Sequence, residues 1–253
     1  MAERLYNLHA IVLKRMPLGE ADRIVRLFSR EHGKVSAVAK GARRLTSKTG
    51  GATEPMTRLH AQLAAGRTLE VLTQAQVEAS RTAVRRDLER LACGSFFLEL
   101  IDAAIEERQP LPELYDLLDA ALTALETAAE PLALTHAFTL QALAQLGFEP
   151  DLHECVLDAV ALESRASRFL VERGGLLCPA CTEEIGGGLV VSAATVRALR
   201  GLSRLPMAEA ATTRLLPGTR PELARVLAAF ARYSLEAPLR SLEFLQEVTA
   251  ERP

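Results

Sequence analysis

The amino-terminal part of the chain alternates between apolar and polar residues in short runs, which is the pattern of β-strands. Turns rich in Gly, Pro and charged residues separate these runs. The predicted strands span residues 5–16, 23–28, 34–40, 57–65 and 68–77. Five short strands predict a small closed β-barrel, and the OB-fold is the five-stranded barrel that binds oligonucleotides. Another small barrel is an open alternative, since periodicity alone does not distinguish them.

The same alternation predicts which side chains fill the barrel. In the third predicted strand, the period of two places Val35, Ala37 and Ala39 on one face. Phe28 lies inside the apolar run of the second strand, so we expect it in the core and not on a surface that stacks against bases.

From Thr82 onward the apolar residues follow the three-to-four-residue period of amphipathic helices. One stripe starts at Val84 and includes Leu88, a second lies within residues 114–125, and a third ends at Gly147. These stripes predict a bundle of helices after the barrel.

A further helix is predicted near the carboxyl end. Thr219 and Glu222 are three residues apart, which is the spacing of a capping box at the start of a helix. The apolar positions of this helix are Leu223, Val226, Leu227, Phe230 and Tyr233.

Residues 150–191 interrupt the helical pattern with three of the four cysteines and two groups of adjacent glycines. We therefore predict a multidomain α+β protein, in which an OB-fold barrel precedes an α-helical domain with a small, degenerate zinc-ribbon-like insert. The predicted divisions are 1–79 for the barrel, 80–149 for the first part of the helical domain, 150–191 for the insert and 192–253 for the second helical part.

Positive charge is concentrated in the barrel. The chain of 253 residues has a formal net charge of −2, yet residues 1–79 contain 13 Lys and Arg against 7 Asp and Glu. Such a segment predicts contact with phosphates, without readout of base sequence. A solvated barrel surface is the alternative interpretation. The candidate DNA-binding residues are Lys14, Arg15, Arg23, Arg26, Lys34, Lys40, Arg43, Arg44 and Lys48.

Composition and hydropathy predict a soluble, cytoplasmic protein. With 49% hydrophobic residues the chain can form a core, which excludes disorder. Charged residues or Gln interrupt every apolar stretch before it reaches the length of a membrane span, and the first residues lack the apolar region of an export signal. Four cysteines are too few for a disulfide scaffold.

The cysteines of the insert predict a metal site. Cys178 and Cys181 form a C-x-x-C on a turn, and Cys155 lies upstream. Where a four-cysteine ribbon would complete a second C-x-x-C, this chain has Asp158, so the fourth ligand is Asp158, with His153 as the alternative. Structural zinc is the predicted cofactor, and plain thiols are the alternative. The remaining Cys93 is predicted to be a small core residue.

Enzyme signatures are missing from the sequence. It has no phosphate-binding G-x-x-x-x-G-K-[ST] loop, no H-E-x-x-H motif and no pair of histidines four residues apart. A metal-dependent nuclease would need clustered carboxylates, and only Asp151, Glu154 and Asp158 come near one another in sequence. We therefore predict no catalytic site.

Two stretches resemble a known family. The run GEADRIVRLFSREHGK at residues 19–34, continued by VAKGARR at 38–44, resembles the N-terminal domain of the bacterial recombination mediator RecO family. The later GGLLCPAC at 174–181 resembles the second half of that family's zinc-ribbon insert. This chain differs from the four-cysteine pattern at Asp158.

The resemblance implies a DNA repair protein of the RecF pathway that binds single- and double-stranded DNA and anneals complementary strands. It implies that the protein works with RecR to help RecA replace SSB on single-stranded DNA, and that its helical domain receives the acidic tail of SSB. The implied location is cytoplasmic and nucleoid-associated. A scaffold for protein partners, with DNA contact secondary, is the alternative.

Overall fold

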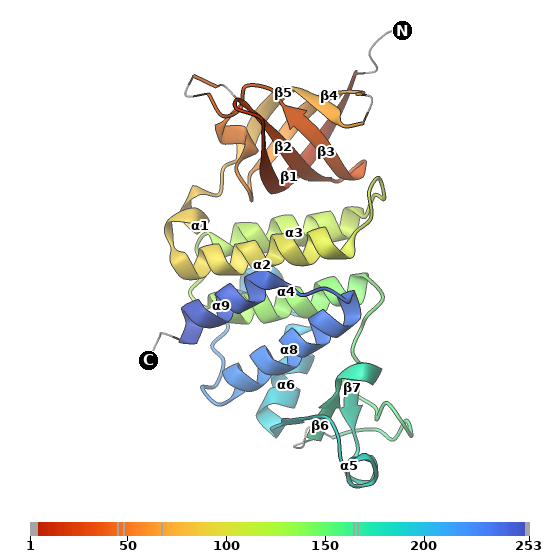
Figure 1. Ribbon diagram of the computed structural model, residues 1–253. Helices are drawn as coiled ribbons and strands as arrows, with labels where there is room; N and C mark the ends of the chain where they lie inside the picture. Colours follow the sequence, from red (N-terminus) through yellow and green to blue (C-terminus); the bar gives the residue numbers. More distant parts are fainter. Residues whose placement is uncertain are drawn as a thin grey trace. The chain divides into compact units, whose positions relative to one another are not determined.

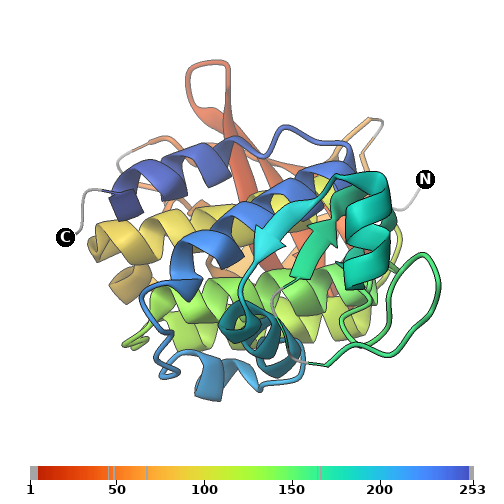
Figure 2. The same cartoon turned by 90° about the horizontal axis from the view of Figure 1, so that it is seen from below.

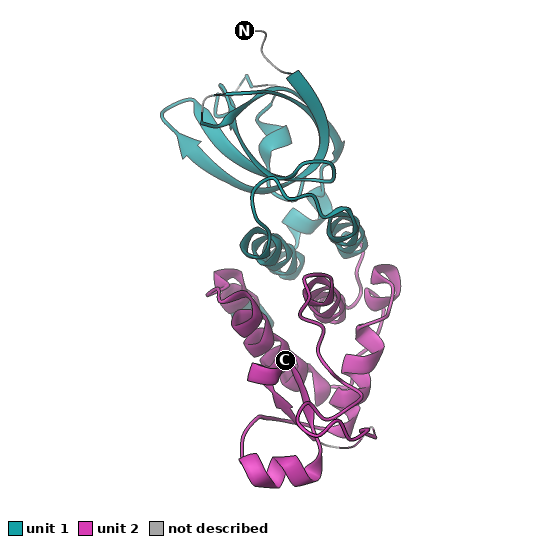
Figure 3. Cartoon of the chain, turned by 90° about the vertical axis from the view of Figure 1, so that its right-hand side faces the viewer, with its two compact units in different colours: residues 1–126, 247–253 teal, residues 127–246 magenta. Residues whose placement is uncertain are grey.

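A computed structural model of the chain describes residues 5–44, 46–47, 49–66, 68–163, 165 and 167–250. The chain divides into two compact units (Figure 3). The first unit contains residues 1–126 and 247–253, and the second contains residues 127–246. Within the described residues, no helix is both long enough and apolar enough to cross a membrane.

The first unit begins with a closed five-stranded barrel (Figure 1). Its strands are β1 (Leu5–Leu18), β2 (Asp22–Ser29), β3 (Gly33–Ala39), β4 (Arg58–Ala64) and β5 (Glu70–Ala79). They follow one another around the barrel in the order β1-β2-β3-β5-β4, and β3 and β5 form the parallel pair. The predicted OB-like barrel is therefore confirmed.

Burial inside the barrel follows the predicted alternation. Val35, Ala37 and Ala39 of β3 are at most 1% exposed and belong to the cluster that fills the barrel. Phe28 is fully buried as well, so it offers no ring for stacking against a base. Both predictions are confirmed.

Three helices follow the barrel in the first unit, namely α1 (Thr82–Arg86), α2 (Leu88–Ala104) and α3 (Pro112–Leu125). Between α1 and α2 the backbone of Asp87 is extended, and its side chain caps α2 by accepting the Arg90 N–H at 3.0 Å. The predicted stripe from Val84 through Leu88 is therefore wrong at Leu88, which is 57% exposed, because the break reorients the chain. Cys93 of α2 is fully buried, as predicted.

The loop between α2 and α3 extends the pairing of β3. Only Ala37 and Val38 of β3 pair with β5. Lys34 forms a bridge with Glu107, and its carbonyl accepts the Arg108 N–H at 3.0 Å. Gly33 makes this approach possible, since a Cβ atom there would lie 2.1 Å from the carbonyl oxygen of Gln109.

The close approach at Gly33 predicts that Gly33→Ala lowers the free energy of unfolding by about 3 kcal/mol or more. Gly19→Ala is the matched control: both glycines have positive φ, at +68° and +54°, but nothing lies within 4 Å of a Cβ at Gly19. We expect that control to cost only about 1 kcal/mol, from backbone strain alone. Urea unfolding would measure both, and equal losses would show that the Gln109 contact is unimportant.

The second unit combines helices with a small antiparallel sheet of order β7-β6-β8. The insert contains β6 (Ser167–Leu170), η2 (Val171–Arg173), β7 (Gly175–Leu177), α5 (Pro179–Ile185) and β8 (Leu189–Val191). The helices around it are α4 (Pro131–Gln145), α6 (Ala193–Leu202), α7 (Met207–Ala210) and α8 (Thr219–Leu235). The last helix, α9 (Arg240–Ala250), runs from the second unit to residues assigned to the first. Figure 2 shows the same elements from below.

The helix predicted from Thr219 exists, but its predicted capping box is wrong. The N-cap of α8 is Gly218, which makes no side-chain capping bond. The Glu222 carboxylate instead accepts the Ser192 N–H at 2.7 Å and the Thr195 hydroxyl at 2.5 Å, at the start of α6. A tertiary contact thus takes the side chain that the local pattern assigned to capping.

Burial of His136 in α4 predicts a loss of stability in acid. Burial lowers the pKa of His136 to about 4, whereas an exposed histidine in the unfolded chain has a pKa near 6.5. Between these values the unfolded state binds more protons, so stability falls as the pH drops from about 6.5 to about 4. Urea unfolding at pH 7 and pH 4.5 should show a loss about 2–3 kcal/mol greater for the native chain than for His136→Phe. An equal loss in both would contradict this role of His136.

Candidate nucleic-acid interface and candidate metal centre

Two of the nine candidate DNA-binding residues are paired with a carboxylate of α2. Arg26 on β2 donates from Nη1 to both Asp102 carboxylate oxygens, at 2.9 and 2.8 Å. Lys34 on β3 donates from Nζ to the Asp102 carbonyl at 2.8 Å and lies 3.9 Å from its carboxylate. These side chains are largely shielded from solvent, so their charges serve the contact between barrel and helix.

Two further candidates meet at Glu54, in the segment between β3 and β4. Arg15 and Arg23 both pair with its carboxylate, Arg23 at 3.3 Å. The same Nη1 of Arg23 also donates to the Thr53 hydroxyl at 2.9 Å and to the Gly50 carbonyl at 3.2 Å. Arg23 therefore shapes this segment, and Glu54 offsets part of the local positive charge.

The loop after β3 brings three exposed basic residues together, and we call Lys40, Arg43 and Arg44 the loop group. Within the described residues, none of the three forms an ion pair. Arg43 donates from Nη1 to the Gly19 carbonyl at 2.6 Å, a bond that holds the side chain but leaves its charge uncompensated. The charge of the loop group is therefore available to an external anion.

Hydrogen bonds fix this loop against the turn between β1 and β2. The Arg43 N–H donates to the Ala21 carbonyl at 2.9 Å, and the Gly41 N–H donates to the Asp22 carboxylate at 2.7 Å. Sequence reasoning missed Asp22 as a positioning residue. The feature that could have indicated this role is the position of Asp22 in the GEADR run, shortly after the turn at Gly19.

The remaining two candidates lie apart from the loop group or outside the described residues. Lys14 is exposed on β1 opposite Arg26, whereas Leu18, at the turn end of β1, pairs with Asp22. Four residues of strand correspond to about 13 Å, so Lys14 is a separate positive charge along the barrel. Lys48 is outside the described residues.

The predicted metal ligands do converge in the insert. One ligand atom each from Cys155, Asp158, Cys178 and Cys181 all lie within 4.8 Å of one another. Asp158 Oδ2 is 3.2 Å from Cys178 Sγ and 3.4 Å from Cys181 Sγ. The alternative ligand His153 is not a member of this group. The structure thus favours Asp158 as the fourth ligand.

The C-x-x-C lies at the start of α5 and not on an isolated turn. Cys178 follows β7 directly, is the N-cap of α5, and accepts the Cys181 N–H at 3.4 Å. The three thiols are buried in a small apolar cluster with Leu177, against which Leu162 and Leu170 pack. This strand-to-helix junction holds the two sulfur atoms on one side of the backbone.

Hydrogen bonds within the cluster favour an ionised carboxylate. Hydrogen bonds from the thiols of Cys155 and Cys178, together with the Val160 N–H, lower the pKa of Asp158 to about 2. The hydrogen bond with Cys178, together with burial, raises the pKa of Cys181. Three sulfur donors and one carboxylate oxygen at this spacing match the tetrahedral ligand sets of zinc, so these residues fit that metal.

Comparison with known proteins gives consistent matches to one family. Residues 1–81 match the family described as Recombination protein O N terminal, and residues 85–243 match Recombination protein O C terminal. The DNA repair protein RecO of Symbiobacterium thermophilum is 37% identical over 98% of this chain and 99% of its own length. The protein of the same name from Roseiflexus sp. is 35% identical over 98% of this chain and 87% of its own length. That from Anaeromyxobacter sp. strain K is 36% identical over 96% of each.

Proposed function

We propose, from the premise that this chain belongs to the RecO family of DNA repair proteins, that it binds single- and double-stranded DNA through its barrel and anneals complementary strands without catalytic turnover. We further propose that it works with RecR to assist loading of RecA onto SSB-coated single-stranded DNA. This role places the protein in the cytoplasm, associated with the nucleoid.

The loop group is the observation that carries the DNA-binding proposal. Lys40, Arg43 and Arg44 are exposed at the loop end of a closed barrel, and the loop is held in place by hydrogen bonds. Positive side chains on a positioned loop neutralise phosphates without contacting base edges. Two strands brought together in this way keep their bases free to pair, which is what annealing requires.

Ion pairs with carboxylates make four of the other candidates less available for DNA contact. Arg26 and Lys34 contribute to the contact with α2, and Arg15 and Arg23 share Glu54. We therefore propose the loop group as the main DNA contact and Lys14 as an accessory one, and we retain Lys48 as a candidate.

The insert is proposed to serve structure, and the helical domain is proposed to bind a protein partner. Cys155, Asp158, Cys178 and Cys181 would hold a structural zinc ion that ties the loop before β6 to the start of α5. We propose that the helical domain, at 80–149 and 192–253, receives the acidic tail of SSB, with the barrel at 1–79 and the insert at 150–191 as separate functional segments. RecR is proposed as a further partner.

Annealing of complementary DNA strands by the full chain tests this proposal. Strand pairing should be accelerated, with and without SSB on the strands, and the acceleration should fall steeply as salt rises, because binding rests on phosphate neutralisation. A chain that binds neither strand at low salt, or whose binding is insensitive to salt, would contradict it.

A protein scaffold with secondary DNA contact is the second candidate function. It is favoured by the internal pairing of Arg15, Arg23, Arg26 and Lys34, which removes much of the predicted positive surface. If the protein is a scaffold, charge reversal in the loop group should leave annealing unchanged. The variant should also bind RecR and SSB with the affinity of the native chain.

A further inference from the structure

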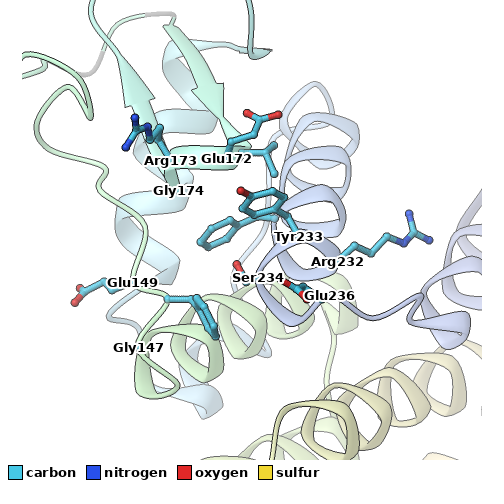
Figure 4. A pocket seen from close by; sticks show the side chains of 12 residues that line it. Gly147, Glu149, Glu172, Arg173, Gly174, Arg232, Tyr233, Ser234 and Glu236 are labelled. Atoms are coloured by element: carbon cyan, nitrogen blue, oxygen red, sulfur yellow. The ribbon is translucent and has the colours of Figure 1, made fainter.

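A pocket of about 580 Å³ in the second unit belongs to neither candidate site. Three segments form it: residues 147–149 directly after α4, residues 171–174 at η2, and the last turn of α8 with the residues that follow (Figure 4). Ligand sites commonly have volumes of about 300–1,000 Å³, so the pocket is large enough to hold side chains of a partner.

Three aromatic rings line this pocket, and two of them are open to solvent. Phe148 is 40% exposed and Tyr233 is 53% exposed. Phe230 also lines the pocket, and it is held in place by an edge-on contact with Phe169 at 5.5 Å between ring centroids. The faces of aromatic rings attract cations, most strongly when water is displaced.

Each of the three segments also contributes a carboxylate. These are Glu149, Glu172 and Glu236, and among the described residues none of them forms an ion pair. Two arginines line the pocket as well. Arg232 donates to the Pro238 carbonyl at 3.3 Å and lies 3.8 Å from Glu243, and Figure 4 shows Arg173 and Arg232 extending away from Tyr233.

The carboxyl ends of two helices meet the same pocket. A helix carries roughly half a negative charge at this end, from carbonyl groups without helical partners. The last turn of α4 contains no basic residue to offset it. The last turn of α8 does contain a basic residue, Arg232, which lies 3.8 Å from Glu243, and the C-cap Glu236 adds a carboxylate to that helix end.

We propose that this pocket binds an arginine or lysine side chain from a basic protein segment. The cation would lie against Tyr233 and Phe148, with Glu172 and Glu236 as its charge partners. A nucleic-acid strand or an acidic peptide is disfavoured here, since both would bring negative charge to carboxylates and helix carboxyl ends. The loop group does not take part, so this proposal can fail without affecting the DNA-binding one.

Fluorescence anisotropy with labelled peptides on the full chain tests the proposal. The probes are an Arg-rich Gly/Ser peptide, a version with Gln at each Arg, and a version with Asp at each Arg that ends in Phe. The Arg-rich peptide should bind more tightly than both others. Tyr233→Ala, which changes no charge, should weaken it about threefold to tenfold.

A matched pair of double variants separates the pocket from general attraction to an acidic surface. Glu172→Gln with Glu236→Gln should weaken the Arg-rich peptide at least as much as Tyr233→Ala. Glu183→Gln with Glu184→Gln changes the charge equally on α5, at residues that do not line the pocket, and should have little effect.

Three results would overturn the proposal. They are equal weakening by the two double variants, tighter binding of the Asp peptide than of the Arg peptide, and unchanged binding in Tyr233→Ala. Circular dichroism and thermal melting of each variant establish that it is folded. Unchanged DNA binding by the pocket variants would confirm that the two sites are separate.

Discussion

Reversal of Lys40, Arg43 and Arg44 to glutamate is expected to weaken binding of single- and double-stranded DNA by about 100-fold to 1,000-fold at low salt. Each of these exposed side chains can neutralise a phosphate and release its counterion, and a glutamate would repel the phosphate instead. The slope of log affinity against log salt should also become shallower by about two to three, because about that number of contacts is lost. Annealing should slow in parallel, since it depends on holding both strands.

The chain offers a matched control for this variant in the second unit. Arg197, Arg204 and Arg214 are exposed, and within the described residues they form no ion pair. Their reversal changes the net charge by the same amount but should leave most of the affinity and the salt slope intact. If both triple variants weaken DNA equally, the effect is one of total charge, and the loop group is not a site.

The residues bound to Asp102 provide a second comparison. Arg26→Gln with Lys34→Gln should lower the melting temperature, because the Asp102 carboxylate loses its partners in a partly buried position. The salt slope of DNA binding should hardly change. A folded variant of this pair that loses DNA affinity like the loop-group variant would show that Arg26 and Lys34 contact DNA.

Removal of zinc should destabilise the second unit, which contains the predicted ligands. We expect about one zinc per chain after purification under reducing conditions, and none in Cys178→Ser. With zinc at about 1,000 times its dissociation constant, a chelator should lower the free energy of unfolding by about 4 kcal/mol. Elemental analysis and chelator-dependent melting measure the two quantities. Cys93→Ala is the control, because this cysteine is buried in α2 outside the cluster.

Asp158 allows the ligand set itself to be tested. Asp158→Ala should lower zinc affinity at least tenfold, while Asp158→Cys completes a four-cysteine site and should raise it. The absorption spectrum of the cobalt-substituted protein reports the number of thiolate ligands. A native chain that binds neither zinc nor cobalt would show that the three thiols and Asp158 form only a hydrogen-bonded cluster.

Local pattern was sufficient for the strands and for the helices α2, α3, α4 and α8. A period of two and the turn residues between runs predicted all five strands of the barrel, because backbone pairing and burial on one face impose that period. It failed where a single side chain decides the local geometry. Asp87 ends α1 and caps α2, and Glu222 accepts the N–H of Ser192, the N-cap of α6, and does not cap its own helix. Both contacts depend on which backbone N–H group is nearest in space.

The sequence alone determined the existence of the barrel, the excess of positive charge on it and the donor atoms available for a metal. The tertiary structure decided which of those charges face solvent. Arg26 meets Asp102, 76 residues later in the chain, and Asp158 lies beside Cys178 and Cys181, whereas His153 does not. The physical reason is range: backbone periodicity acts over a few residues, whereas ion pairs, ligand clusters and pockets depend on side chains that only the packed fold brings together.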